Sequence, residues 1–498
     1  MKKLYILIAI AVTAISSSSC EKWLEATSST QISAEKLFST RSGFHEALSG
    51  VYIDMGSENC YGKDYTWFVN DLACYPYVIQ SDATYSIWQS HLYEGPSATL
   101  TIKYMWKGGY NVIANVNKIL QELDEHRDII TDDTEYNLMK GELLAIRAYL
   151  HFDIMRMFGL DNWNGDNADK LTVPYVTKYD KEPTKQKSYS ETAAMLLDDI
   201  NTSLECLKED PVTGNEPSTF ENEMNTDGFW SNRTKHLNYY AVEALAARVY
   251  LWEKDYSKAK KMARNVIDST LINGTVSWVD AQAQVNKTNN DYRDWTFSQE
   301  QIFSLEVTGL YSIVSDNLFT STSTIKVASN IVSDLFPVID STGAVSGAED
   351  IRGPAMALKY TSNGYIPYKL YGSSSYAIAY RNRMPMIRIS EMYYILAEAA
   401  CHDKDYPAFV DAINEVRSHR GITDKYTVSR FTNIKDCQRE LTNEYEREFI
   451  NEGQLFYFIK RTYGDYGMPE NITVNATPDN LIYPYPESET TYGHIQEK

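Results

Sequence analysis

The sequence predicts a mostly α-helical protein in which helical repeats alternate with an irregular, loop-rich region. Two observations support this fold class. One nine-residue helical segment occurs twice, and one helix–turn–helix arrangement occurs twice at a fixed distance, whereas β-prone runs are short. With 498 residues, the chain is also long enough for about two or three packed subregions.

The N-terminus has the order of residues that is typical of a secretory signal. Two lysines precede an apolar run at residues 4–15, and four serines then lead to Cys20. The run is too short for a membrane-spanning helix, so we expect residues 1–19 to be removed and residues 20–498 to remain. Cys20 resembles the acylated first residue of a bacterial lipoprotein, which would tether the protein to a membrane. The alternative is an ordinary signal peptide with an incidental cysteine.

The repeated segment marks two helices of one kind. Residues 142–150 read ELLAIRAYL and residues 243–251 read EALAARVYL, and they agree at six of nine positions. After the second copy, apolar and small residues continue at helical spacing through residue 267. This order predicts a helix, a short turn at Lys254 and Asp255, and a second helix.

The same turn recurs near the C-terminus, where Lys404 and Asp405 lie 150 positions after Lys254 and Asp255. Small residues near the turns let paired helices approach closely. The pattern resembles tetratricopeptide repeats, whose helix pairs bury their faces by stacking on neighbours. The expected helical-repeat parts are, approximately, residues 101–160, 190–208, 236–268 and 386–462.

The stretches between the helical parts differ in composition and predict loops. They are rich in Gly, Ser, Thr, Asn, Tyr and Trp, with short β-prone runs such as Gln301–Val307. Long loops inside a compact protein are usually functional or disordered, and the aromatic content argues against disorder. The loop-rich parts that we expect beside the repeats are, approximately, residues 56–100, 209–235 and 270–385.

The charge of the chain argues against nucleic acid as a partner. The formal net charge is −20, and no stripe of Lys and Arg is present to displace the counterions of a phosphate backbone. A solvated acidic surface is the simplest explanation of this charge.

The cysteines do not form a recognisable framework. Five cysteines follow Cys20, with no C-x-x-C pair and no spacing typical of zinc sites. We expect most of them to be small buried residues. A bridge between Cys60 and Cys74 stays open as an alternative in an oxidising compartment.

No catalytic, cofactor or metal motif is complete. The chain has neither a G-x-x-x-x-G-K phosphate loop nor a G-x-S-x-G nucleophile turn. His45 and Glu46 begin a zinc-protease motif, but Ser49 stands where the second histidine is needed. The stretch Asp161–Asp169 resembles a calcium loop in composition, yet Trp163 replaces an oxygen ligand, so we favour a solvated turn. We predict a protein that is not an enzyme and has no cofactor or metal.

The most specific motifs lie in the C-terminal third, and further motifs precede them in the chain. They are CEKWLE at 20–25, GELLAIRAYLHF at 141–152, DIR at 350–352, RISEMYYILAEAA at 388–400, AINEVR at 412–417, EYEREFINEG at 444–453 and Lys460-Arg461. In this order they resemble the SusD/RagB family of outer-membrane lipoproteins, over nearly the whole mature chain. Leu455 and Phe458 stand where relatives often carry arginine and aspartate, and we expect apolar packing there.

The resemblance implies a lipid-anchored protein on the cell surface of Gram-negative, Bacteroidetes-type bacteria, attached to the outer membrane through Cys20. Such proteins have a tetratricopeptide-like scaffold with an irregular ligand-binding region. They act as non-catalytic nutrient-binding lids on SusC-like, TonB-dependent β-barrel transporters. The implied ligand is an oligosaccharide. A peptide, as RagB-like members suggest, is the alternative, and a surface hydrolase is a further one.

The expected ligand contacts combine aromatic and polar side chains. A sugar ring presents an apolar face to an indole or phenol ring, and its hydroxyls need Asn, Asp or Arg partners. The resemblance implies that loops within 56–100 and about 270–320 hold the ligand, the second offering Trp278, Tyr292 and Tyr311 as well. The predicted contacts are Trp67, Asn70, Asp71, Asp82, Tyr85, Trp88 and Trp295. The alternative for each aromatic residue is packing in the core or within a loop.

Overall fold

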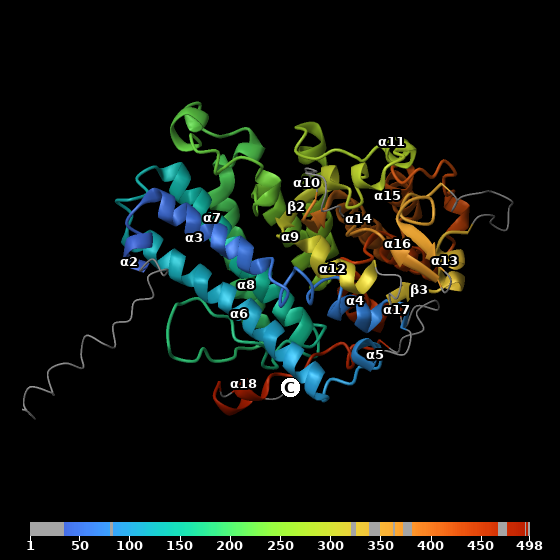
Figure 1. Ribbon diagram of the computed structural model, residues 1–498, viewed down its shortest axis with the longest axis horizontal. Coiled ribbons are helices and arrows are strands. Elements are labelled where there is room, and N and C mark those ends of the chain that lie inside the picture. The colour runs from blue at the N-terminus through green and yellow to red at the C-terminus, as the bar shows by residue number, and fades with distance from the viewer. Residues whose placement is uncertain are drawn as a thin grey trace, which may run out of the picture.

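Helices make up most of the protein, and small sheets lie beside them. The computed structural model describes residues 34–79, 83–319, 325–337, 349–361, 364–371, 381–466, 476–493 and 495–496. Cys20 and Asp82 lie outside these ranges. Figure 1 shows the helices of the N-terminal part at one end of the long axis and those of the C-terminal third at the other.

Long helices form the body of the molecule. They are α3 (Arg41–Met55), α6 (Pro96–Glu125), α7 (Asp133–Phe158), α8 (Tyr189–Cys206), α9 (Tyr239–Trp252), α10 (Tyr256–Ile272), α14 (Ile389–Asp403), α15 (Tyr406–Ser418), α16 (Ile434–Glu448) and α17 (Gln454–Tyr466). The shorter helices are α2 (Ala34–Leu37), α4 (Val69–Cys74), α5 (Ala83–Gln89), α11 (Ala281–Asn286), α12 (Leu310–Leu318), α13 (Ser329–Leu335) and α18 (Glu487–Thr491).

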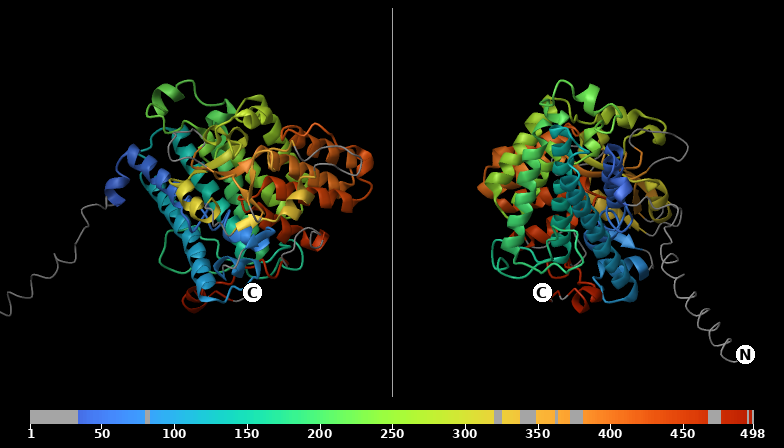
Figure 2. Two further views of the ribbon diagram at one scale, coloured as in Figure 1. Left: turned by 45° about the vertical axis from the view of Figure 1, so that its right-hand side comes forward. Right: turned by 90° about the vertical axis from the view of Figure 1, so that its left-hand side faces the viewer.

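The long helices pack as pairs that continue into one another. Helix α6 packs on α7 and α7 on α8, while α9 packs on α10 and α14 on α15. Contact between α10 and α14 joins the last two pairs. In the right-hand view of Figure 2, helices of the N-terminal half and the middle of the chain lie side by side as rods. The prediction of a mostly α-helical fold with tetratricopeptide-like repeats is confirmed.

The two turns that recur 150 positions apart share one geometry. Lys254 and Lys404 both adopt a left-handed backbone with φ of 59°. Asp255 and Asp405 then cap the following helices, because each side chain accepts a hydrogen bond from the backbone N–H three residues further on. A left-handed residue followed by an aspartate cap reverses the chain within two or three residues, which lets paired helices pack closely.

The sequence repeat also has a structural meaning. Arg147 and Arg248 occupy the same place in the two nine-residue copies. Arg147 donates to both carboxylate oxygens of Asp199 on α8, each at 2.7 Å. Arg248 donates to both oxygens of Glu391 on α14, at 2.5 and 2.6 Å. In each copy, therefore, a buried two-pronged ion pair ties the repeat helix to a neighbouring helix.

Two small antiparallel sheets carry the loop-rich stretches. One has the strand order β1 (Tyr77–Ile79), β3 (Ile325–Val327), β5 (Gly364–Pro367) and β4 (Leu358–Thr361). The other pairs β2 (Gln301–Glu306) with β6 (Arg383–Arg388), and β2 occupies the β-prone run predicted from the sequence. Because β1 pairs with β3, the first loop-rich stretch lies directly beside the third.

Apolar side chains form one extended core and a smaller satellite. The satellite contains Val279, Trp295, Phe297, Ile351 and Met356. In the main core, Leu455 is buried and Phe458 stacks on Tyr445 with centroids 4.1 Å apart, which confirms the apolar packing expected there.

Three further observations concern cysteines and membranes. Cys60 and Cys74 are both buried and free, so they form no bridge with each other. The other cysteines of the described ranges are free as well. Within the same ranges, the helices are too short or too polar to cross a membrane.

Candidate ligand-binding site

Most of the predicted contact residues are buried. Trp67, Trp88 and Trp295 are each at most 2% exposed, and Asn70 and Asp71 are fully enclosed. Packing in the core, the alternative for each aromatic residue, therefore describes these three tryptophans in the structure. For Trp295, the rings of Tyr368 and Tyr371 from a distant segment contribute to this burial.

The polar atoms of these tryptophans are used inside the protein. The indole N–H of Trp67 donates to the carbonyl of Gly62 at 2.9 Å, and that of Trp295 donates to the carbonyl of Asn290 at 3.0 Å. Both rings also belong to apolar clusters of the core. Contact of these residues with a ligand stays a prediction, and the structure gives them a packing role.

Asn70 and Asp71 join the N-terminal stretch to the C-terminal motif. The Asp71 carboxylate accepts hydrogen bonds from the backbone N–H groups of Asn451 at 2.6 Å and Gly453 at 2.9 Å. Burial raises the pKa of Asp71 to about 7, and those two hydrogen bonds oppose the rise. The Asn70 side chain accepts from the hydroxyl of Tyr483 at 2.9 Å. Partners 380 or more positions away thus enclose both residues.

Tyr85 is half-buried and lies at the edge of a further group of rings. Its hydroxyl donates to the side-chain oxygen of Asn317 on α12. Its ring meets Phe68 edge to face, with centroids 5.4 Å apart. Asp82, the remaining predicted contact, lies outside the described residues.

Helix α12 positions the first two rings of that group. Gly309 precedes the helix with a left-handed φ of 76°, which glycine adopts without strain. The buried side of the helix consists of Leu310, Val314 and Leu318. Tyr311 and Phe319 lie about two turns apart on a neighbouring side, where their half-buried rings stack with centroids 5.9 Å apart. The helix thus anchors one side and presents two rings on another.

The segment after β5 supplies two more rings. The Tyr368 N–H donates to the carbonyl of Ala357 at 2.7 Å, and the Tyr371 N–H donates to that of Tyr368 at 2.8 Å. This turn stacks the two tyrosines with centroids 4.9 Å apart. Their rings lie 5.2 and 5.5 Å from Phe319, and 5.7 and 5.8 Å from Trp295. Residues from three separate segments therefore meet.

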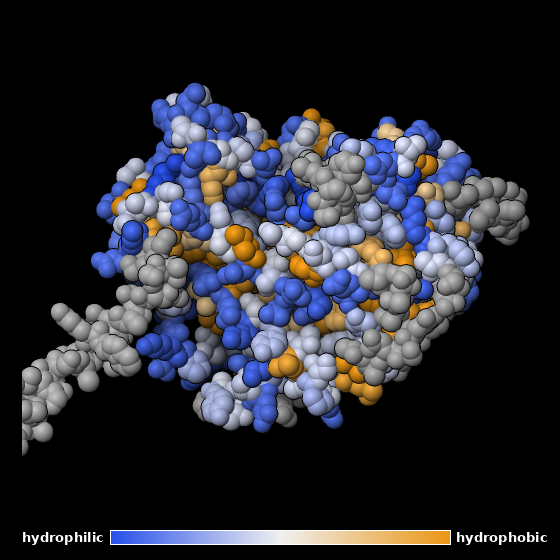
Figure 3. All heavy atoms as spheres, viewed as in Figure 1, coloured by the Kyte–Doolittle hydropathy of each residue, from blue (hydrophilic) through white to orange (hydrophobic). Residues whose placement is uncertain are grey.

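The aromatic cluster, as we name it, consists of Trp295, Tyr311, Phe319, Tyr368 and Tyr371. Except for Trp295, its members are half-buried, so each ring is held by neighbours while part of it stays accessible. Within the described part of the chain, the hydroxyls of Tyr311 and Tyr368 have no hydrogen-bond partner. In Figure 3, hydrophobic and hydrophilic residues are interspersed on the face that carries α12. Such a surface can stack on sugar rings and hydrogen-bond to their hydroxyls.

Two cations lie over the ring of Trp295. The ammonium of Lys359 on β4 and the guanidinium of Arg293 are each 5.6 Å from the ring centroid. Arg293 is held by hydrogen bonds to the backbone carbonyls of Lys287 at 2.8 Å and Val285 at 3.2 Å. Burial lowers the pKa of both cations, and Arg293 lowers the pKa of Lys359 further. Positive charge is therefore fixed beside the aromatic cluster.

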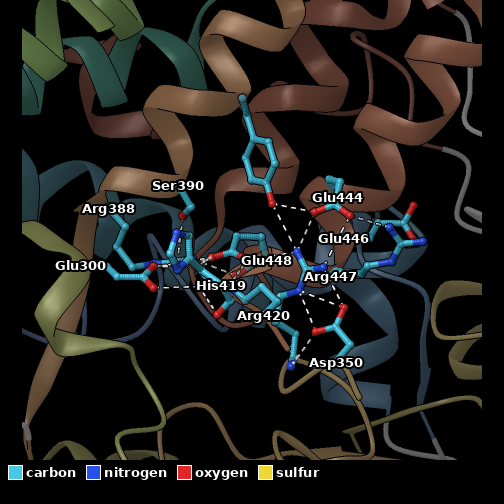
Figure 4. A network of polar contacts seen from close by, with 12 residues as sticks. Glu300, Asp350, Arg388, Ser390, His419, Arg420, Glu444, Glu446, Arg447 and Glu448 are labelled. Carbon is cyan, nitrogen blue, oxygen red and sulfur yellow. Dashed lines mark hydrogen bonds and ion pairs between the residues drawn. The ribbon is translucent and has the colours of Figure 1, made fainter. Parts of the chain in front are cut away.

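The C-terminal motif forms a second charged group, which is closed. This ion network comprises Glu300, Asp350, Arg352, Arg388, Arg420, Glu444, Arg447 and Glu448, all buried (Figure 4). Arg420 donates to Glu448 at 2.7 Å and to Glu300 at 2.6 Å. Burial alone would raise the pKa of Glu448, but Arg420 and Arg388 hold it well below its usual range. The network contains no accessible acid or base, and it joins loops around residues 300 and 350 to α16.

The acidic stretch Asp161–Asp169 forms a closed turn. Trp163 is fully buried, and the side-chain amide of Asn167 donates to the carbonyl of Asp161 at 2.6 Å. Across the described residues, no group of three or more His, Cys, Asp and Glu side chains could hold a metal ion.

A cavity of about 330 Å³ between α6 and α18 is a weaker candidate. Its walls include Trp106 and Tyr110, but Trp106 is only 4% exposed. The Tyr110 hydroxyl already donates to the carbonyl of Pro174 at 2.8 Å. The cavity thus offers less accessible ring surface and fewer unoccupied hydroxyls than the aromatic cluster.

Sequence reasoning named two members of the aromatic cluster, Trp295 and Tyr311, and missed the others. The eight-residue spacing between Tyr311 and Phe319 was a usable signal, because it places two rings on one side of a helix. The Y-x-x-Y spacing of Tyr368 and Tyr371 suggests a turn but does not reveal which rings it meets.

Two family models match the sequence. Residues 4–221 match a model described as starch-binding associating with outer membrane, and residues 340–492 match the model of the SusD family. The chain belongs to the SusD family. No curated protein matches it in sequence.

Solved structures of SusD-superfamily proteins share the fold of this family member. One from Bacteroides vulgatus is 17% identical, with a TM-score of 0.65 and coverage of 92% of this chain and 98% of its own. One from Bacteroides thetaiotaomicron is 14% identical, with a TM-score of 0.68 and coverage of 91% and 97%. A SusD-like carbohydrate-binding protein from Bacteroides vulgatus is 16% identical, with a TM-score of 0.65 and the same coverage.

The ranges that match the family models divide the two regions differently. Most of the ion network lies within residues 340–492, which match the SusD model. In the aromatic cluster, Tyr368 and Tyr371 lie within that range, whereas Trp295, Tyr311 and Phe319 fall between the two matched ranges.

Proposed function

We propose that this protein captures oligosaccharides at the aromatic cluster on the cell surface and passes them, without catalysing a reaction, to a SusC-like TonB-dependent transporter. The observation that carries the proposal is the packing of Tyr311, Phe319, Tyr368 and Tyr371 into one group of half-buried rings. Membership of the SusD family supports it, since one family model is described as starch-binding and a structural neighbour is a carbohydrate-binding protein.

The expected affinity is modest. Two or three ring contacts contribute about 0.5 to 1.5 kcal/mol each, and a few hydrogen bonds add about 1 kcal/mol each. The loss of motional freedom on binding offsets much of this gain. A dissociation constant of about micromolar to millimolar follows, which suits a protein that must release its cargo to a transporter.

Lipid attachment at Cys20 would keep the protein at high local concentration beside its transporter. Stable anchoring takes at least two acyl chains, and a multiply acylated cysteine provides them. A flexible tether would let the globule move over a barrel without leaving the membrane. The association of the family with the outer membrane supports this part of the proposal.

One of the predicted contacts, Tyr85, lies at the margin of this site. Tyr85 reaches α12 through Asn317, and Asp82 precedes the helix that carries Tyr85. We include both as proposed contributors to the ligand site. The buried residues Trp67 and Trp88 are instead proposed to support the binding surface from below.

Binding measurements on single variants test the cluster. Tyr311→Ala and Tyr368→Ala should each weaken binding of an oligosaccharide, identified on a glycan array, by several-fold in isothermal titration calorimetry. Tyr492→Ala is the matched control, because Tyr492 is 77% exposed and lies beside α18. Unchanged affinity in both cluster variants would disprove the site. Binding of peptides instead of glycans, lost in the same variants, would establish the RagB-like alternative.

Membrane experiments test the rest of the proposal. Cys20→Ala should release the protein from the membrane fraction and impair import, while its affinity for the ligand in solution stays unchanged. A pull-down of the wild-type protein from outer membranes should recover a large β-barrel partner. If no such partner is recovered, the result counts against delivery to a transporter. Ligand capture is tested separately by the calorimetry.

A further inference from the structure

Lys359 and Arg293, which are half-buried, differ from most of the buried arginines of this protein. Arg233 pairs with Asp210 and Glu142, and Arg248, Arg388, Arg420 and Arg461 also contact carboxylates. Within the described residues, no carboxylate lies within ion-pair distance of Lys359 or Arg293. In a chain with a net charge of −20, two neighbouring cations without a counter-charge are unexpected.

The nearest acidic side chain in sequence does not neutralise them. Asp294 follows Arg293 directly, but its carboxylate accepts hydrogen bonds from the backbone N–H of Ser298 at 2.7 Å and from its hydroxyl at 2.8 Å. Arg293 in turn donates to backbone carbonyls, which hold the guanidinium in place but carry no net charge. Among the described residues, therefore, no carboxylate compensates this local positive charge.

Contact with Trp295 does not explain the arrangement by itself. A cation over an aromatic ring gains about 0.5 to 2 kcal/mol. Here, two cations share one ring and repel each other, and burial disfavours the charged form of both. Paired buried charges elsewhere show that this fold can place a carboxylate where one is needed. A charge without a carboxylate partner beside half-buried rings is typical of a site that an anionic group completes on binding.

We propose that Lys359 and Arg293 form an anion subsite at the aromatic cluster, and that the captured ligand is an oligosaccharide bearing carboxylate or sulfate groups. The inference rests on the proposed function, since it names the class of glycan that the same site selects. The stacked rings of Tyr368 and Tyr371 contact Trp295, so a sugar stacked there would place an acidic substituent within reach of both cations.

Pairing of the two cations with an anionic group would give the subsite selectivity for acidic glycans as well as affinity. A hydrogen bond between ionised partners is roughly twice as strong as one between neutral groups, and added salt weakens it by screening the charges. A neutral glycan would leave the cations without a partner and would gain only the stacking contacts. The subsite therefore favours acidic over neutral sugars of the same backbone.

A glycan array with matched pairs tests the inference. It presents oligogalacturonides beside their methyl esters, and sulfated oligosaccharides beside their desulfated forms. The anionic member of a pair should bind more tightly, and added sodium chloride should weaken it selectively. The methyl-ester pair reports on carboxylate recognition, and the desulfated pair reports on sulfate recognition.

Calorimetry on variants then assigns the subsite. Lys359→Gln should weaken binding of the preferred anionic glycan about tenfold and leave its neutral counterpart unaffected. Lys359→Arg should retain most of the affinity, and Lys260→Gln, on the exposed side of α10, should have no effect. Thermal melting of each variant separates loss of binding from loss of folding. The salt dependence of the wild-type protein provides the same test without a substitution.

The outcomes distinguish this inference from the proposed function. The anion subsite is overturned if the wild-type protein prefers neutral glycans. It is also overturned if Lys359→Gln loses affinity equally for both members of a pair. Either result leaves glycan capture intact. Binding of no glycan at all overturns the proposed function and the inference with it. Binding of an acidic peptide in place of glycans overturns both and points to the RagB-like alternative.

Discussion

The ion network and the aromatic cluster show two opposite ways of using charged and aromatic residues. In the network, Glu448 and Glu444 are fully buried, and each contacts more than one guanidinium. In the aromatic cluster, the tyrosine rings are half-buried and the hydroxyls of Tyr311 and Tyr368 have no partner among the described residues. The charged groups of the network are paired within the protein, whereas two hydroxyls of the cluster have no partner among the described residues.

The two regions therefore differ in role. The network joins α16 to the loops that carry Glu300 and Asp350, and most of it lies in the range that matches the SusD family model. The cluster draws Trp295, Tyr311 and Phe319 from the range between the two matches, and Tyr368 and Tyr371 from the second matched range. The network holds the scaffold together, while the cluster is the surface that we propose binds the ligand.

Removing a charge from the network should have the largest effect. Glu448→Gln leaves Arg420, Arg388 and Arg352 short of a counter-charge, so we expect a loss of about 3 to 5 kcal/mol in the free energy of unfolding. Denaturation in guanidinium chloride measures it. The control, Glu205→Gln, removes an exposed carboxylate and should cost less than about 1 kcal/mol. Equal losses in the two variants would contradict the structural role of the network.

Removing the charge of an unpaired buried carboxylate should raise the free energy of unfolding, which is the opposite of the effect expected for Glu448→Gln. Asp64 is 4% exposed, and its Oδ1 has no hydrogen-bond partner in the described structure. Burial raises the pKa of Asp64 to about 7, above its value of about 4 in the unfolded chain. Because the folded protein then binds the proton more tightly, ionisation of Asp64 lowers stability as the pH rises from about 4 to about 7.

The variant Asp64→Asn should therefore match the wild type near pH 4 and exceed its stability by about 1 to 3 kcal/mol near pH 8. Urea unfolding at a series of pH values measures the difference. Asp128→Asn, at an exposed position, should show no such pH dependence. If the wild type were more stable than Asp64→Asn at high pH, Asp64 would have a partner in the folded protein. Buried charges outside the network would then be compensated too.

A change within the cluster should have the smallest effect on stability and a separate effect on binding. Phe319→Leu keeps apolar volume but removes ring contacts with Tyr311, Tyr368 and Tyr371, which should cost about 1 kcal/mol of stability and weaken glycan binding several-fold. Phe38→Leu breaks the distant Phe38–Phe44 pair and should lower stability similarly without changing affinity. Equal affinities of the two variants would remove the distinction between scaffold and site.

Local patterns in the sequence were sufficient for the helical elements. The nine-residue copies lie within α7 and α9, the turns at Lys254 and Lys404 have the same left-handed geometry, and β2 covers the predicted β-prone run. Helical periodicity, aspartate caps and β-propensity act over a few residues, so neighbours in sequence carry this information. The apolar packing of Phe458 was readable for the same reason, since its partner Tyr445 comes from the preceding helix.

Burial and the composition of the site were decided by tertiary structure alone. The sequence suggested Trp67 and Asp71 as ligand contacts, yet both are buried, and backbone N–H groups of the C-terminal motif bind the Asp71 carboxylate. Trp295, Phe319 and Tyr371 come from separate segments and meet only after folding. The sequence by itself determined the helices and the family, and it predicts a secretory leader. Which rings stay accessible, and which charges remain unpaired, depends on contacts between distant segments that no local pattern encodes.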